Sequence, residues 1–144
     1  MWGVIAAHPK DFETLRETLR SLRRHVADLQ EIVVISPTSP EPATLAAASG
    51  PGKGRAAGSY QRVFGPALWF DEARFPFSLA DFAGLRPSAG WHLQQLLKLY
   101  APRVLSEAQP PILPSAAAAA DAFFLVVDAD TVWLQVTSGP GGGG

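Results

Sequence analysis

The sequence predicts an α/β domain whose sheet is mostly parallel. Three short apolar runs lack the polar–apolar alternation of a strand with one solvated face, and they lie at residues 2–7, 32–36 and 123–128. Such runs are typical of strands that are buried on both faces. The stretch between the first two runs has the three- and four-residue apolar spacing of an amphipathic helix. A strand, a helix and a strand in this order predict a βαβ unit with two parallel strands.

The composition is that of a globular protein, and it excludes several classes of function. The chain has 144 residues, 47% hydrophobic and 17% charged, and a net charge of -1, so no strong charge attracts nucleic acid. Without cysteine there is no disulfide, no thiolate nucleophile and no cysteine-ligated zinc. No apolar stretch approaches the ~20 residues that span a bilayer, and no basic region precedes the first apolar run. We therefore expect no transmembrane segment, no signal peptide, no nucleic-acid partner and, by default, a cytoplasmic location.

The first strand ends at a turn, and the first helix follows it. The turn is His8-Pro9-Lys10, and Asp11 stands where the N-cap of the helix is expected. The apolar face of this helix comprises Phe12, Leu15, Leu19, Leu22 and Val26. Basic residues gather in its last turns, where they suit the negative end of the helix dipole and form a solvated face.

Two stretches of low complexity interrupt the domain, at residues 37–59 and 106–122. They are rich in small residues and proline and contain few large apolar side chains, which predicts loops or insertions. Residues 132–136 fit a further short strand. Because the chain then becomes glycine-rich, we expect a domain over residues 1–136 and a linker-like tail over residues 137–144.

An aromatic-rich stretch over residues 63–82 lies between the first insertion and the second helix. Its aromatic side chains are Phe64, Trp69, Phe70, Phe75, Phe77 and Phe82. Packing against the sheet is the first interpretation, and a stacking platform for a ring is the alternative. The pattern leaves open the orientation of the acidic residues among them, which are Asp71, Glu72 and Asp81.

A second helix is expected over residues 88–101. Ser88 suits its N-cap, and Pro102 is expected to limit its continuation. One face is apolar and comprises Leu93, Leu96, Leu97 and Tyr100. A neighbouring face comprises Trp91, Gln94, Gln95 and Lys98. The second face is either exposed to solvent or lines a site in which Lys98 balances phosphate charge.

Two carboxylates, Asp128 and Asp130, follow the third apolar run directly. Open α/β sheets bind ligands at the C-terminal ends of their strands, so we expect both side chains at that edge. Two carboxylates this close repel each other, and a divalent cation with oxygen ligands commonly holds them together. An Asp-rich turn that binds no ligand is the alternative.

By themselves, residues Phe124 to Thr131 resemble the motif of haloacid-dehalogenase-type phosphatases. That resemblance implies that Asp128 is a phosphoryl-accepting nucleophile and that Asp130 is a general acid. The mechanism also needs a downstream lysine and further acidic residues, and none follows Asp130. The motif usually opens its domain, whereas most of this chain precedes it. A phosphatase is therefore the second interpretation.

Three separated blocks resemble a family of glycosyltransferase-like proteins of the GT-A type. Its recurrent features are a Gly-Trp-x-x-Gln-Gln-x-x-Lys helix, matched by Gly90 to Lys98, and a Leu-Val-x-Asp-x-Asp-Thr strand, matched by Leu125 to Thr131. The segment from Ile5 to Asp11, with the helix after it and residues 32–36, is similar to the N-terminal unit of that family. The helix block is the most specific, because an Asp-x-Asp pair alone is common.

The resemblance implies a three-layer α/β/α fold related to the Rossmann arrangement. It also implies an enzyme that transfers a sugar from a nucleotide-sugar donor to an acceptor. The implied metal ligands are Asp128 and Asp130, with Mn²⁺ or Mg²⁺ as the cofactor. The residues implied to contact the donor are His8, Lys10, Asp11, Gln95 and Lys98.

Transferases of this type are far longer than 144 residues, and their acceptor site lies in the later half. We therefore expect this chain to be the N-terminal part of such an enzyme, and no catalytic residue is assigned. A third interpretation is an inactive fragment or degenerate domain that retains the fold.

Overall fold

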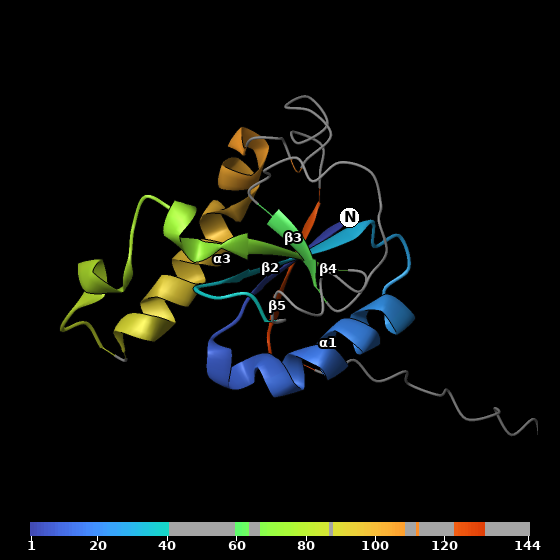
Figure 1. Ribbon diagram of the computed structural model, residues 1–144, viewed down its shortest axis with the longest axis horizontal. Coiled ribbons are helices and arrows are strands. Elements are labelled where there is room, and N and C mark those ends of the chain that lie inside the picture. The colour runs from blue at the N-terminus through green and yellow to red at the C-terminus, as the bar shows by residue number, and fades with distance from the viewer. Residues whose placement is uncertain (41–59, 64–66, 87, 109–111, 113–122, 132–144) are drawn as a thin grey trace, which may run out of the picture.

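The sheet contains the three expected strands and two more. The structure, a computed structural model, describes residues 1–40, 60–63, 67–86, 88–108, 112 and 123–131. The strands in these residues are β1 (Trp2–Ala6), β2 (Glu31–Ser36), β3 (Tyr60–Val63), β4 (Ala67–Asp71) and β5 (Phe124–Asp128). They lie in the order β3-β4-β2-β1-β5 (Figure 1).

Four of the five strands are parallel, as the sequence predicts. β1 pairs with β2 on one edge and with β5 on the other, so that Ala6 at its end lies between Ile35 and Asp128. β4 pairs in parallel with β2, and β3 runs antiparallel to β4. Neither β3 nor β4 was expected as a strand. β4 is a short part of the aromatic-rich stretch, and its strand character depends on pairing with β2, which local spacing does not reveal.

The sheet is the middle of three layers, which confirms the α/β/α fold. Figure 1 shows the strands between α1 (Phe12–His25), on the lower right, and α3 (Ala89–Glu107), on the left. On one face, α1 packs with the strand residues Ile5, Ile32 and Val34. On the other face, α3 packs with Val4, Val33 and Ile35. Consecutive strand residues thus enter opposite cores, which is why the apolar runs show no alternation.

The turn after β1 leads into α1 through the short 3-10 helix η1 (Pro9–Asp11). Asp11 is the N-cap residue of α1, as expected, but its carboxylate makes no capping hydrogen bond. Instead, Thr14 Oγ1 donates to the carbonyl oxygen of Asp11 at 2.9 Å. The side chain of Asp11 therefore does not cap α1.

α3 continues past the proline that was expected to limit it. The predicted end at Ala101 was wrong, because the helix runs through Pro102 to Glu107. A proline there has no N–H for the carbonyl of Lys98, a defect that costs ~3 kcal/mol in a helix interior. Ala101 and Leu105 are fully buried in the core on either side of Pro102. Burial of these side chains offsets the local cost.

β5 is parallel to β1 as expected, but the prediction that it is buried on both faces was wrong. Among the described strands it pairs with β1 alone, so it lies at an edge of the sheet. Val127 is buried in the core under α1, whereas Val126 is 47% exposed. The apolar run does not reveal how many neighbours the strand has.

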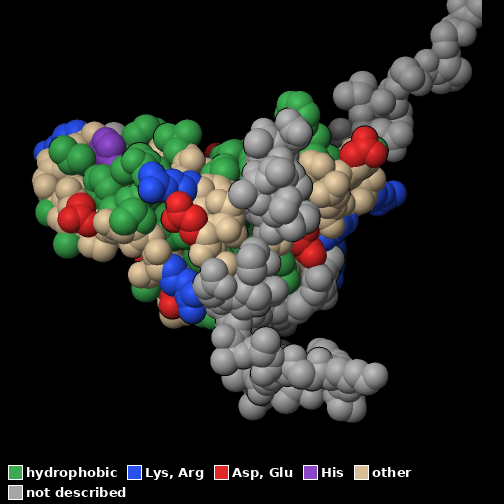
Figure 2. Space-filling model, turned by 90° about the horizontal axis from the view of Figure 1, so that it is seen from above, with side chains coloured by type: hydrophobic (Ala, Val, Ile, Leu, Met, Phe, Trp, Pro, Cys, Tyr) green, Lys and Arg blue, Asp and Glu red, His purple; other side chains and the backbone are tan. Residues whose placement is uncertain are grey.

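Apolar side chains gather at the end of the molecule that is formed by η3 (Leu79–Phe82) and α3, on the left of Figure 2. The large ones exposed on these elements and beside them are Leu79, Leu85, Trp91, Leu99 and Tyr100. Charged side chains of both signs lie among them in this view, so the apolar surface is broken up.

Several expectations concern residues that the structure does not describe. They are the strand at residues 132–136, the tail at residues 137–144 and most of both insertions. The second insertion begins later than predicted, because Ser106 and Glu107 belong to α3. No helix within the described part of the chain is both long enough and apolar enough to cross a membrane.

Leu97 tests the contribution of α3 to the core. It is 2% exposed, whereas Leu99 on the same helix is 72% exposed. We expect Leu97→Ala to lower the free energy of unfolding by about 2–5 kcal/mol, because the deletion leaves a cavity. Leu99→Ala should change it by no more than ~0.5 kcal/mol. Equal effects in urea denaturation would contradict this assignment of the buried face.

Candidate functional site

The chain builds the sheet first on one side of β1 and then on the other. From β1 it passes through α1 to β2 and onward to β4, and it then returns through α3 to β5. Ligands of open α/β sheets bind outside the C-terminal ends of the strands where the strand order reverses in this way. At the reversal, Ala6 at the end of β1 lies opposite Asp128 at the end of β5.

A cleft of about 290 Å³ lies at this reversal, and we name it the β1–β5 cleft. Its lining residues are Ala6, Lys10, Asp11, Trp91, Gln94, Gln95, Asp128, Ala129 and Asp130. Six of these nine side chains carry a charge or an amide, so the cleft suits a hydrophilic ligand. The predicted site residues that meet here are Lys10, Asp11, Gln95, Asp128 and Asp130.

The turn that carries the two carboxylates is held by α1 and by its own backbone. Thr18 of α1 is fully buried, and its Oγ1 donates to the carbonyl oxygen of Ala129 at 2.7 Å. The amide of Thr131 donates to the carbonyl oxygen of Asp128 at 3.2 Å. Because Ala129 itself is buried in the core, Asp128 and Asp130 project from a firmly held support.

The beginning of α3 supplies the opposite wall of the cleft. Ser88 Oγ accepts a hydrogen bond from the amide of Trp91 at 3.2 Å, which confirms the predicted N-cap. Trp91 is half exposed, and Gln94 and Gln95 follow it at helical spacing. The structure thus places this face beside the strand-end carboxylates, which is the second of the two arrangements considered from the sequence.

Lys98 forms an ion pair with Asp128. Its side chain is only 5% exposed, whereas that of Asp128 is 66% exposed, and Nζ donates to Oδ1. A buried ammonium without a partner is strongly destabilising, so Asp128 is the group that makes burial of this lysine tolerable. The sequence predicted that Lys98 balances phosphate charge, but its contact in the structure is with a carboxylate. Lys98 is joined to the cleft through Asp128 and does not itself line it.

His8 lies apart from the β1–β5 cleft. Its ring is exposed, and Nδ1 accepts a hydrogen bond from the amide of Lys10 at 3.3 Å, which caps η1. The ring acts electrostatically on Glu72, at a different place on the same edge of the sheet. The loop after β1 therefore places Lys10 and Asp11 in the β1–β5 cleft, whereas its His8 lies near Glu72.

Asp128 and Asp130 are the predicted metal ligands, and both line the β1–β5 cleft. Within the described residues, no group of three or more His, Cys, Asp or Glu side chains could hold a metal ion. Asp128 and Asp130 supply two carboxylates, and Oδ1 of Asp128 already accepts from Lys98. Mg²⁺ is commonly held by one or two carboxylates that are supplemented by substrate phosphates and water. These residues therefore fit a cation that binds together with a phosphate group.

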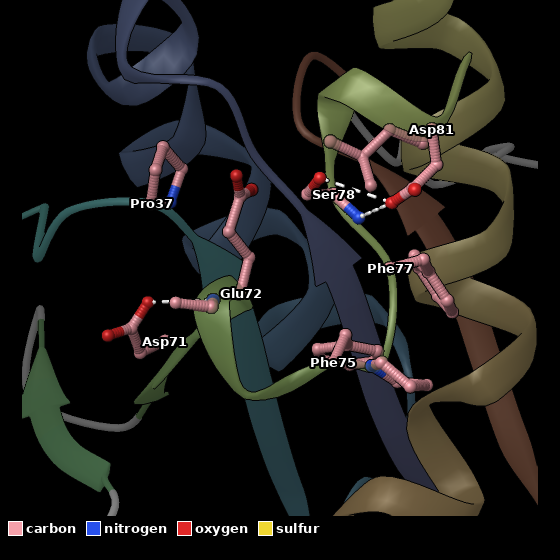
Figure 3. A pocket seen from close by; sticks show the side chains of 10 residues that line it. Pro37, Asp71, Glu72, Phe75, Phe77, Ser78 and Asp81 are labelled. Carbon is pink, nitrogen blue, oxygen red and sulfur yellow. Dashed lines mark hydrogen bonds between the residues drawn. The ribbon is translucent and has the colours of Figure 1, made fainter.

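A second cleft, of about 430 Å³, lies at the C-terminal ends of β2 and β4, and we name it the β2–β4 cleft (Figure 3). Its lining residues are Pro37, Asp71, Glu72, Ala73, Phe75, Pro76, Phe77, Ser78, Asp81 and Leu93. This cleft was not predicted from the sequence. A signal was present, because Asp71 and Glu72 follow the apolar run of β4 directly, just as Asp128 follows that of β5.

Glu72 is the carboxylate with a perturbed proton affinity in this second cleft. Burial raises the pKa of Glu72 above its ordinary value, the charge of Asp71 raises it further, and His8 partly opposes both effects. Its carboxylate makes no hydrogen bond and no ion pair with the described residues, and in Figure 3 it points into the cleft. A partly buried acid without a partner is typical of a binding position.

No protein-family model, no curated protein and no solved structure matches the chain. Any inference about what the two clefts bind therefore comes from the residues that line them.

The pairing of Lys98 with Asp128 can be measured by a double-mutant cycle. We expect Asp128→Asn to destabilise the fold more than Asp130→Asn, because only the former leaves a buried ammonium unpaired. In the background of Lys98→Met, the cost of Asp128→Asn should fall by about 1 kcal/mol or more. Additive effects in chemical denaturation would show that the two side chains are not coupled.

The raised pKa of Glu72 makes stability depend on pH in a defined direction. The folded chain binds this proton more tightly, so the stabilising contribution is complete below the ordinary value of 4.5 and is lost as the pH rises through the folded value. We expect Glu72→Gln to exceed the wild type in stability at pH 7, by at most ~0.5 kcal/mol because the side chain is partly exposed. The two proteins should converge below pH 4.5, as measured by thermal unfolding, and a difference that widens in acid would contradict the assignment.

Proposed function

We propose that the chain is the donor-binding part of a metal-dependent glycosyltransferase that uses a nucleotide sugar. The observation that carries the proposal is the β1–β5 cleft, in which Asp128 and Asp130 meet the glutamines of α3 where the strand order reverses. The hydrophilic lining suits the phosphates and hydroxyl groups of such a donor.

Asp128 and Asp130 are the residues that would hold Mn²⁺ or Mg²⁺. When bound, the metal neutralises charge on the donor diphosphate and so makes it a better leaving group. No described residue donates a hydrogen bond to Oδ2 of Asp128 or to the carboxylate of Asp130. Lys98 keeps the Asp128 carboxylate at the mouth of the cleft, because its ammonium is buried and pairs with Oδ1.

The other lining residues suit recognition of a sugar and a phosphate. Gln94 and Gln95 each bring an amide that both donates and accepts hydrogen bonds, as hydroxyl groups require. Lys10 supplies a positive charge in η1, just before the N-terminus of α1, where the helix dipole also favours an anion. Trp91 is half exposed and offers an aromatic face to a sugar ring or a base.

A phosphatase that uses Asp128 as its nucleophile is the second candidate, and one observation favours it. That mechanism needs a lysine beside the nucleophile, and no lysine follows Asp130 in the chain. Lys98, which precedes the motif, is nevertheless paired with Asp128. Both candidates place a phosphate group in the same cleft and differ in whether Asp128 becomes covalently modified.

Calorimetric titration of the chain with Mn²⁺ and a panel of nucleotide sugars tests the first candidate. We expect binding that depends on the metal and that Asp128→Ala and Asp130→Ala each abolish, because each removes a metal ligand. Glu17→Ala is the matched control, since Glu17 is an exposed acid of α1 that pairs with Arg20. It should leave binding unchanged.

The outcomes separate the candidates. Lack of binding across the panel, or binding that survives both aspartate substitutions, rules out the transferase. Beryllofluoride trapped at Asp128 in the presence of Mg²⁺ would then indicate the phosphatase. A protein that responds to neither ligand would be an inactive domain that retains the fold.

A further inference from the structure

The β2–β4 cleft has no role in the proposed function, yet it has the size of a ligand site. Its volume of about 430 Å³ lies within the range of ~300–1,000 Å³ that is usual for small-molecule pockets. It opens at the C-terminal edge of the sheet, between the ends of β2 and β4 and the beginning of α3 (Figure 3). Ligands of this class of fold bind along the same edge.

One side of the cleft is apolar and well supported. Phe75 and Leu93 are buried in the core, and Phe77 packs against it. The ring of Phe77 lies 5.7 Å from that of Phe75 and 5.3 Å from that of Tyr100, measured between ring centroids. This aromatic contact holds the wall of the cleft in place without a ligand.

The acidic side chains of the cleft differ in their engagement. Asp71 accepts from the amide of Ala73 at 2.9 Å, and Asp81 accepts from the amide and hydroxyl of Ser78. Both therefore serve local turns. Glu72 has no such partner among the described residues, and Figure 3 shows its carboxylate pointing between Pro37 and Ser78 into the cleft.

Among the residues that the structure describes, the cleft lining contains no lysine, arginine or histidine to pair with Glu72. A single free carboxylate beside an aromatic wall matches one positive charge carried on an apolar body. The ammonium group pairs with the carboxylate of Glu72, and the apolar part of the ligand packs against the apolar side of the cleft. The aromatic rings attract the positive charge. A metal ion is a poorer match, because the other two carboxylates are engaged in turns and no three-residue metal group exists among the described residues.

We propose that the β2–β4 cleft binds an organic amine, with Glu72 as the counter-ion of its ammonium group and with Phe75, Phe77 and Leu93 against its apolar body. The site is independent of the β1–β5 cleft in its chemistry, but the two are close in the fold. Leu93 lines one and Gln94 lines the other, so the same turn of α3 forms a wall of each.

The test is a titration of the full chain with phenethylammonium chloride, followed by two-dimensional NMR in the absence of metal and nucleotide sugar. We expect shifts of the backbone amides of Leu93 and of the residues other than proline over residues 71–82. The neutral analogue 2-phenylethanol should bind at least about tenfold more weakly, because it cannot form a charge-assisted hydrogen bond with Glu72. Glu72→Gln should weaken binding of the amine by a similar factor.

Glu17→Gln is the matched control, because it removes an exposed carboxylate of α1 on the opposite side of the sheet. It should leave the affinity unchanged. The proposal is overturned if the amine does not shift these amides, if the neutral analogue binds equally well to the wild type, or if Glu72→Gln has no effect. Since no metal or nucleotide sugar is present, these results do not depend on the glycosyltransferase proposal.

Discussion

The pairing of β1 with a strand on each edge is the constraint on which the rest of the structure depends. Both of its faces are covered by helices, so nearly every side chain of β1 is buried and its backbone is bonded to β2 and β5. Its last residue, Ala6, lies opposite Asp128, and the loop that follows brings Lys10 and Asp11 to the same edge. A slip of one residue between β1 and β5 would turn Asp128 to the opposite face and dismantle the cleft.

α3 contains two features that oppose its own stability, and they are four residues apart. Lys98 carries a charge into the core, and Pro102 withholds the amide that the carbonyl of Lys98 would otherwise bond. A sequence selected for helix stability alone would contain neither. Proteins break local rules mostly at functional positions, and here Lys98 pairs with the carboxylate of Asp128. The cost is offset by burial of Ala101 and Leu105.

The two clefts lie on one edge of the sheet and differ in chemical character. The β1–β5 cleft has acids, a lysine and two glutamines, which suits a hydrophilic ligand. The β2–β4 cleft has an aromatic wall and the carboxylate of Glu72, which has no partner among the described residues, so it suits a cation attached to an apolar group. The loop after β1 places Lys10 and Asp11 in the β1–β5 cleft, and its His8 acts electrostatically on Glu72 of the β2–β4 cleft. The first turns of α3 line both clefts, so a ligand in either cleft lies near the same helix.

The sequence by itself determined the elements that have strong local signals: three apolar strands, the periodic face of α1, the cap at Ser88, and the position of Asp128 and Asp130 at a strand end. It did not determine β3 and β4, the edge position of β5, or the length of α3, because each depends on contacts between distant segments. The partner of Lys98 is the clearest case. Helical spacing placed Lys98 on a face that was expected either to be exposed to solvent or to line a site. Only the packing of α3 on β1 buried its ammonium, and a buried charge requires an opposite charge nearby, here Asp128.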